Sequence, residues 1–235
     1  MWCQPAVAQS VDANEYSAEA YGLGSVAGRA GAILYAGTTR RFAASDTEFN
    51  SYQGAAVATL RLLPSLVEAW AGFIYRFTDN HASANQHEYR PFVVLFAATD
   101  QTRAVRFTTL SRAEYLLKTA VDGRAVDDYW RLRSRLALDF PLRGTDWTKG
   151  TSYGVVDFEP LFELRSESAT VDELRIRFGL GYLVTEHWIA EVLWTMSLHA
   201  ADGDEPLAWD RNMFRFRVKY RWENLGRLVA AGLDF

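Results

Sequence analysis

The sequence predicts an all-β protein, specifically a closed antiparallel transmembrane β-barrel of about twelve strands with its apolar face outward to lipid and an Arg/Glu-rich lumen. Three observations support this. Several segments alternate strictly between apolar and charged residues, about twelve segments of mostly 8–13 residues fit strands, and no run of ten or more residues repeats every 3.6 residues as a helix would. Because successive side chains of a strand point to opposite faces, such alternation gives a ribbon with one apolar and one charged side.

The clearest alternation lies in residues 214–222. Phe214, Phe216, Val218, Tyr220 and Trp222 share one face, and the residues between them are Arg215, Arg217, Lys219 and Arg221. A helix would scatter these four positive charges around its circumference, whereas a strand gathers them on one side. The segment is therefore predicted to be a strand.

The remaining segments follow in chain order. Less regular strands are expected over 16–23, 29–38, 52–62, 67–77, 87–96 and 105–117. Clearer alternation predicts strands over 130–140, 154–165, 174–182 and 214–222. Another less regular strand is expected over 188–198, and a last strand over 226–235. Short polar stretches at 185–187 and 223–225 supply turns.

Composition excludes several other classes of protein. With 49% apolar and 14% aromatic residues among 235, the chain is not disordered, and the single Cys3 rules out a disulfide framework. The longest apolar run, 91–99, is flanked by Arg90 and Asp100 and is half as long as a membrane-spanning helix requires. A soluble globule and a transmembrane barrel remain.

Strand length and side-chain size favour the membrane barrel over the soluble one. In a soluble barrel the apolar face points inward, but here that face is crowded with aromatic residues, including Trp70, Trp130, Trp188, Trp194 and Trp222. Strands of about 10 residues, at ~3.3 Å each and tilted about 45°, rise roughly 23 Å, close to the apolar band of an outer-membrane barrel. An even strand count of about twelve allows the sheet to close.

Both ends of the sequence point to export. Residues 5–9, Pro-Ala-Val-Ala-Gln, resemble the end of a secretory signal peptide cut after Ala8, so residues 1–8 are expected to be its remnant and 9–235 the barrel domain. The charged and apolar parts of such a peptide are missing, so either the chain starts at an internal Met or the pattern is chance. Phe235, in register with Val229, Ala231 and Leu233, resembles the terminal signal read by the outer-membrane barrel assembly machinery of Gram-negative bacteria.

The order of several short motifs is similar to that of the bacterial outer-membrane barrels catalogued as domain of unknown function 2490. The motifs are Leu63-Pro64-Ser65 before the Gly-aromatic strand 70–75, His87-Glu88-Tyr89-Arg90-Pro91, Arg112-Ala113-Glu114, the Arg-rich 129–136, Phe140-Pro141-Leu142 and the Asp-x-Glu segment 157–162. The resemblance covers about residues 19–235. It implies the barrel fold and an outer-membrane location, and it implies no activity.

The alternation places a charge cluster on the lumen face. Its expected members are Glu88, Arg90, Arg106, Arg112, Glu114, Arg131, Arg133, Arg135, Asp157, Glu159, Glu163, Arg165, Arg175, Arg177, Glu191, Arg215, Arg217, Lys219 and Arg221. These are 13 basic and 6 acidic residues in a chain of net charge −4. Either the opposite charges pair and brace the barrel, or the unmatched cations create a field that favours anions, as in anion pores.

Motifs for catalysis or metal binding are absent from the sequence. The four histidines, His81, His87, His187 and His199, are not spaced as metal ligands, and there is no Gly-rich phosphate loop or Gly-x-Ser-x-Gly elbow. Outer-membrane lipases place Ser, His and an acid or amide on the barrel wall, and His87 with Glu88, or His187 with Ser197, could supply parts of such a site. Neighbouring residues on a strand face opposite sides, however, and nothing selects a nucleophile. We therefore expect no enzyme activity, no cofactor, no metal and no nucleic acid.

The function predicted from the sequence is a narrow, porin-like channel or a structural barrel with a positively charged lumen. Its expected partners are outer-membrane lipid, the barrel assembly machinery and, on the anion-field interpretation, small anions. Two alternatives stay open: an outer-membrane lipid-modifying hydrolase or acyltransferase, and a soluble periplasmic β-barrel that binds an apolar ligand.

Overall fold

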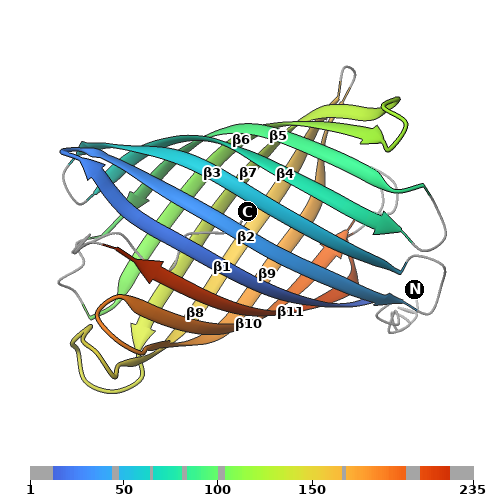
Figure 1. Cartoon of the computed structure of the whole chain (residues 1–235). Coiled ribbons are helices and arrows are strands. Elements are labelled where there is room, and N and C mark those ends of the chain that lie inside the picture. Colours follow the sequence, from blue (N-terminus) through green and yellow to red (C-terminus); the bar gives the residue numbers. More distant parts are fainter. Residues whose placement is uncertain are drawn as a thin grey trace, which may run out of the picture.

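The computed structural model describes residues 13–43, 48–63, 66–80, 84–99, 104–165, 168–199 and 207–222. Within these ranges the chain forms eleven strands and no helix long and apolar enough to span a membrane (Figure 1). The strands are β1 (Ala13–Ala27), β2 (Ala30–Ala43), β3 (Phe49–Leu63), β4 (Val67–Asn80), β5 (Gln86–Ala98), β6 (Arg106–Ala120), β7 (Ala125–Pro141), β8 (Ser152–Arg165), β9 (Ser168–Leu183), β10 (Trp188–His199) and β11 (Ala208–Arg221).

The strands form one closed barrel in which each pairs with its neighbours in sequence and β11 closes against β1. All-β closure was predicted, but the predicted all-antiparallel arrangement needs one correction, because β1 and β11 run parallel, with Ala20 opposite Val218. Eleven consecutive up-and-down strands leave the first and last pointing the same way, so the closing pair must be parallel. The predicted twelfth strand, 226–235, lies outside the described residues.

The two ends of the barrel differ in their connections. We call the end at which β1 begins, on the right in Figure 1, the proximal end, and the opposite end, with the β1–β2 turn, the distal end. The ends of the pairs β2–β3, β4–β5, β6–β7, β8–β9 and β10–β11 that connect in sequence lie at the proximal end, and those of β1–β2, β3–β4, β5–β6, β7–β8 and β9–β10 at the distal end. At the β1–β2 turn Gly28 has φ 53°, a left-handed conformation that favours glycine.

The predicted division between the two faces of the wall is confirmed. On β11, Phe214 and Phe216 point outward and are 41% and 50% exposed, whereas Arg217 and Lys219 point into the lumen and are at most 1% exposed. The same two-residue pattern of burial runs along β7, from buried Arg131 to buried Asp139. The barrel therefore turns its charged side chains inward.

Apolar side chains also fill part of the lumen, which the alternation did not predict. In the distal half, buried apolar residues from β1 to β6 form a cluster: Tyr21, Leu23, Ile33, Tyr35, Val57, Trp70, Ile74, Phe92, Val94, Phe96 and Leu110. The expectation that Trp70 belongs to the outward face is wrong. Its indole stacks on Phe96 at 5.0 Å between ring centroids, and its Nε1 donates a hydrogen bond to Glu68.

A second apolar cluster lies at the distal end of β8–β10 and comprises Tyr153, Val155, Leu183, Ile189 and Leu193. Trp147, from the β7–β8 connection, packs against it. The Trp147 Nε1 donates a 2.9 Å hydrogen bond to the Ala104 carbonyl, and the Arg106 guanidinium lies 3.8 Å from the ring centroid. The distal lumen is thus occupied by packed side chains.

Candidate functional site

The most closely packed charges in the lumen lie on β7, β8 and β9. Asp157 and Glu159 of β8 lie between arginines of the two neighbouring strands. Their register partners on β9 are Arg177 and Arg175, whereas the contacts with β7 are diagonal, since Asp157 is opposite Ala137. Arg133 Nη2 is 2.7 Å from Glu159 Oε1, and Arg135 Nη2 is 2.6 Å from Asp157 Oδ2. Arg177 of β9 contacts both carboxylates, with its Nε 2.7 Å from Asp157 Oδ1. All five side chains are buried, so both carboxylates are paired with guanidinium groups away from water.

A similar arrangement follows on β5, β6 and β7. Glu114, which has no exposed surface, pairs with Arg131 across the β6–β7 ladder, and its Oε2 is 2.9 Å from Arg112 Nη2. Glu88 pairs with Arg90 on the same face of β5. Each carboxylate therefore has at least one guanidinium partner, from the same strand for Glu88 and from both its own and the next strand for Glu114.

Charge pairs also span the parallel β1–β11 seam. Arg217 of β11 pairs with Glu19 of β1, and its Nη1 is 4.0 Å from Glu191 of β10. Glu191 additionally accepts hydrogen bonds from Lys219 Nζ at 2.9 Å and from the Tyr153 hydroxyl at 2.7 Å. The first and last strands are thereby linked through side chains as well as through backbone pairing.

The structure places the predicted charge cluster on the lumen face, as the alternation indicated. The buried members are Glu88, Arg90, Arg112, Glu114, Arg131, Arg133, Arg135, Asp157, Glu159, Arg177, Glu191, Arg215, Arg217 and Lys219. Others lie nearer the ends: at the proximal end Arg165 forms ion pairs with both Glu163 and Asp127, Arg175 is half-buried, and Arg106 and Arg221 are distal. Phe235, the predicted assembly signal, lies outside the described residues.

The alternation missed several inward acidic residues and cations. The buried acids outside the predicted cluster are Glu15, Glu19, Glu68, Asp139 and Glu173. Of these, Asp139 does follow the alternation of 130–140, which places it on the same face as Arg135. On β1 the outward residues are small, as at Ala18 and Ala20, so no contrast marked Glu15 and Glu19 as facing inward. With these included, the buried charged side chains in the described part of the chain are ten carboxylates and nine cations. The cation excess predicted for the lumen is therefore confined to half-buried inward arginines such as Arg76, Arg175 and Arg211.

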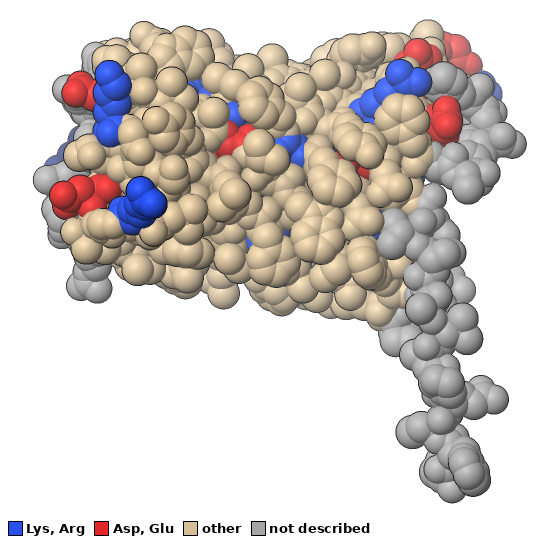
Figure 2. Space-filling model, turned by 90° about the horizontal axis from the view of Figure 1, so that it is seen from below, with Lys and Arg blue, Asp and Glu red and all other residues tan. Residues whose placement is uncertain are grey.

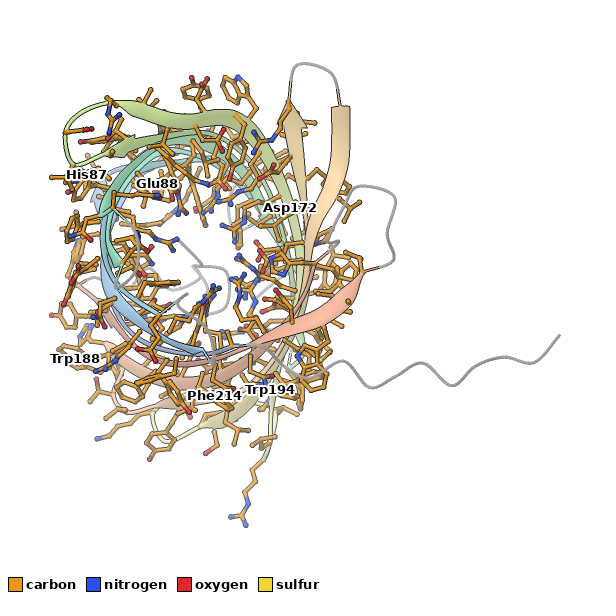
Figure 3. All side chains as sticks on the ribbon, turned by 90° about the vertical axis from the view of Figure 1, so that its right-hand side faces the viewer. His87, Glu88, Asp172, Trp188, Trp194 and Phe214 are labelled. Atoms are coloured by element: carbon orange, nitrogen blue, oxygen red, sulfur yellow. The ribbon has the colours of Figure 1, made fainter. Side chains whose placement is uncertain are left out.

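Several of these half-buried arginines surround a cavity in the proximal half of the lumen. Its volume is about 90 Å³. It is lined by Arg76, Arg90, Arg131, Arg133, Arg175, Arg211 and Arg215, by Glu15 and Glu19, and by Thr39, Phe49, Ser51, Gln53 and Met213. Figure 3, which looks into the barrel from the proximal end, shows nitrogen-bearing side chains projecting into the central space. We call this the arginine cavity.

The outward face has the opposite character. Among its strand positions within the described ranges, charged residues occur only toward the proximal end and include Arg40, Asp79 and Asp128. The face drawn in Figure 2 is mostly uncharged between the charged groups at its two ends, and only small charged areas show between its residues. Aromatic pairs lie near both ends: Tyr16 with Phe214 at 5.6 Å, toward the proximal end, and Trp188 with Tyr220 at 4.8 Å, toward the distal end.

Neither predicted acid–base pair is brought together. Ser197 is buried near the proximal end of β10, whereas His187 precedes the distal start of that strand, where its Nδ1 lies 2.9 Å from the Arg221 carbonyl oxygen. His87 lies on the outside of the wall beside Tyr75 and Glu88 on the inside (Figure 3). Within the described ranges no three His, Cys, Asp or Glu residues are placed to hold a metal ion.

Comparisons with known proteins identify a family. The model of the family described as protein of unknown function (DUF2490) matches residues 32–208, about three quarters of the chain. No curated protein and no solved structure is significantly similar.

Proposed function

The chain belongs to the family of proteins of unknown function DUF2490, and we propose that it is an outer-membrane β-barrel with a lumen braced by ion pairs and filled by side chains. On this proposal it is a closed or very narrow barrel and not a general diffusion pore. The observation that carries the proposal is the inside-out distribution of polarity, with charged residues buried in the lumen and large apolar residues exposed around the wall.

The exposed apolar side chains support a lipid environment. Leu34, Tyr52, Val93, Leu180 and Val192 lie on five strands around the wall and are each more than half exposed. In water such a continuous apolar surface would promote association, because monomeric soluble proteins rarely expose patches larger than a few hundred Å². An uncharged belt with aromatic residues near both edges is the pattern of outer-membrane barrels.

The packing of the lumen supports the absence of a wide pore. Barrels of roughly 8 strands are filled by their own side chains, and wide aqueous channels occur at 16–18 strands. With eleven strands this barrel lies nearer the filled class. Its distal lumen holds two apolar clusters, and the cavity among the proximal arginines is only about 90 Å³.

The test is membrane insertion followed by conductance. We expect the purified full chain to require detergent, to fold into lipid vesicles, and to show no conductance in planar bilayers at the level of a general porin. A protein that stays soluble without detergent and does not insert would contradict the membrane role. Large, stable conductance steps from a homogeneous inserted sample would contradict the filled lumen.

A narrow anion channel is the second candidate function, and the excess of arginine around the cavity favours it. On this proposal a small conductance would show a reversal potential for anions in a salt gradient, because low-dielectric walls focus the positive field. The preference should weaken as the Debye length falls from ~10 Å at 0.1 M salt to ~3 Å at 1 M. Cation preference, or no conductance at all, would remove this candidate.

A further inference from the structure

We propose that the arginine cavity is a binding site for a small oxyanion, either inorganic phosphate or the phosphoryl group of a larger molecule. This inference goes beyond the barrel's membrane role and does not depend on it, since the cavity is formed within the lumen alone. It rests on the donors that line the cavity, on where their carboxylate partners lie, and on the size of the space.

Three arginines present unused donors to the cavity. The Arg76 Nε donates a 3.2 Å hydrogen bond to Gln53 Oε1, and the Nε atoms of Arg90 and Arg131 donate to Glu88 and Glu114. No other residue in the described ranges hydrogen-bonds to these three guanidinium groups, so their Nη atoms, which carry four of the five N–H donors of each group, are left for a ligand. Paired N–H donors of this kind match the oxygens of phosphate or a carboxylate.

The carboxylates that balance these charges lie outside the cavity lining. Glu88 pairs with Arg90 and Glu114 pairs with Arg131, and neither carboxylate borders the cavity. Arg76 has the neutral partner Gln53. The guanidinium groups are therefore fixed before a ligand arrives, which lowers the entropic cost of binding.

The two carboxylates that do line the cavity are already engaged. Glu15 Oε1 is 2.7 Å from Arg41 Nη2, and it is 3.4 Å from Arg211 Nε. Glu19 pairs with Arg217 and accepts a 2.8 Å hydrogen bond from the Tyr21 hydroxyl. The surface left for a ligand is cationic and rich in donors, so it selects an anion with several acceptor oxygens over a cation or a neutral molecule.

The volume suits a small group. A cavity of about 90 Å³ has room for several water molecules, so it can hold a single tetrahedral oxyanion. A phosphoryl group attached to a larger molecule would also fit if the rest of that molecule extended toward the proximal end.

The experiment measures binding of inorganic phosphate to the full-length barrel in uncharged detergent by isothermal titration calorimetry. We expect saturable binding with one site per chain. Arg76→Gln should weaken it at least about tenfold, because a charge-assisted hydrogen bond contributes more than one decade of affinity and this substitution strands no carboxylate. Arg61→Gln is the matched control: Arg61 is also an inward lumen arginine, but it lies at the distal end, 3.5 Å from Glu68, and should leave phosphate affinity unchanged.

A second variant keeps the test decisive if Arg76→Gln does not fold. Gln53→Glu places a carboxylate beside the Arg76 guanidinium and should abolish phosphate binding while leaving the barrel intact, as judged by circular dichroism.

Repeating the titration with glycerol 3-phosphate separates the two sources of the phosphoryl group. Equal affinity for the two ligands indicates a phosphoryl group on a larger molecule, and binding of inorganic phosphate alone indicates the free ion. No saturable binding by the unmodified protein, or equal weakening by Arg61→Gln and Arg76→Gln, would overturn the proposal. Because the assay needs no lipid bilayer, its failure is distinguishable from failure of the membrane role.

Discussion

Arg177 shows at the scale of one residue how the lumen tolerates so many charges. It has no exposed surface, and it contacts the two neighbouring inward carboxylates of β8, Asp157 and Glu159. An isolated buried charge costs several kcal/mol of stability. Arg177 alone is one cation for two acids, and Arg133 and Arg135 of β7 supply a further cation to each acid, Arg133 to Glu159 and Arg135 to Asp157. The group contains three arginines and two carboxylates, so each carboxylate has two guanidinium partners.

Replacing Arg177 should therefore cost more than replacing either of its neighbours. We expect Arg177→Gln to lower the free energy of unfolding by about 3–5 kcal/mol, because both carboxylates lose a partner. Arg135→Gln should cost about 1–2 kcal/mol, since Asp157 keeps its contact with Arg177. Denaturant unfolding in detergent measures both. Arg124→Gln is the control, because Arg124 forms an exposed pair with Asp122 worth at most about 1 kcal/mol. Equal effects for all three would contradict a bracing role.

At the scale of the strand, the sequence alone identifies the inward face wherever one face carries charged residues and the other carries large apolar residues. β11 and β7 meet that condition, and their inward and outward sides were predicted correctly. β5 does not, because residues 92–96 are apolar on both faces, so nothing local distinguishes buried Phe92 from exposed Val93. The arginine cavity could not be predicted from the local pattern of residues either. Its lining comes from strands that are far apart in the sequence and that meet only when the barrel closes.

The outward face of β11 can be tested against its inward face on the same strand. If Phe216 faces lipid, Phe216→Arg should cost about 2–4 kcal/mol of folding free energy in vesicles. Met213→Glu should cost much less, because Met213 lines the arginine cavity, where a new carboxylate lies near Arg211 and Arg215. Equal folding free energies would contradict the assignment of the two faces. Gly179, although it is an inward position, is unsuitable for this comparison, because a Cβ there would lie 2.1 Å from Leu193 Cδ2.

At the scale of the whole molecule, closure depends on the single parallel seam between β1 and β11. The seam joins the two ends of the strand order and brings Ala20 opposite Val218, nearly 200 residues away. Sequence pattern could not predict it, because alternation identifies each strand without its partner. Trp222 packs over this seam against Gly24, where any Cβ would lie within 2 Å of the indole.

A cysteine pair across the seam tests this closure. In a Cys3→Ser background, Ala20→Cys with Val218→Cys should form a disulfide on oxidation, because adjacent strands lie about 4.8 Å apart. Ala20→Cys with Ala36→Cys, across the antiparallel β1–β2 pair, is the matched control. A strand inserted between β11 and β1 would separate Ala20 and Val218 to roughly 10 Å, beyond the ~7 Å limit for a disulfide. Cross-linking of the control alone would therefore show that another strand occupies the seam.

The odd number of strands has a consequence for sidedness. Because β1 and β11 both start at the proximal end, Ala13 and Trp222 lie at opposite ends of the barrel. An even number of passes returns a chain to the compartment from which it set out, and eleven passes do not. In a bilayer, the flank before Ala13 and the flank after Trp222 would begin in different compartments, so epitope tags at these two positions would differ in their access to an impermeant antibody.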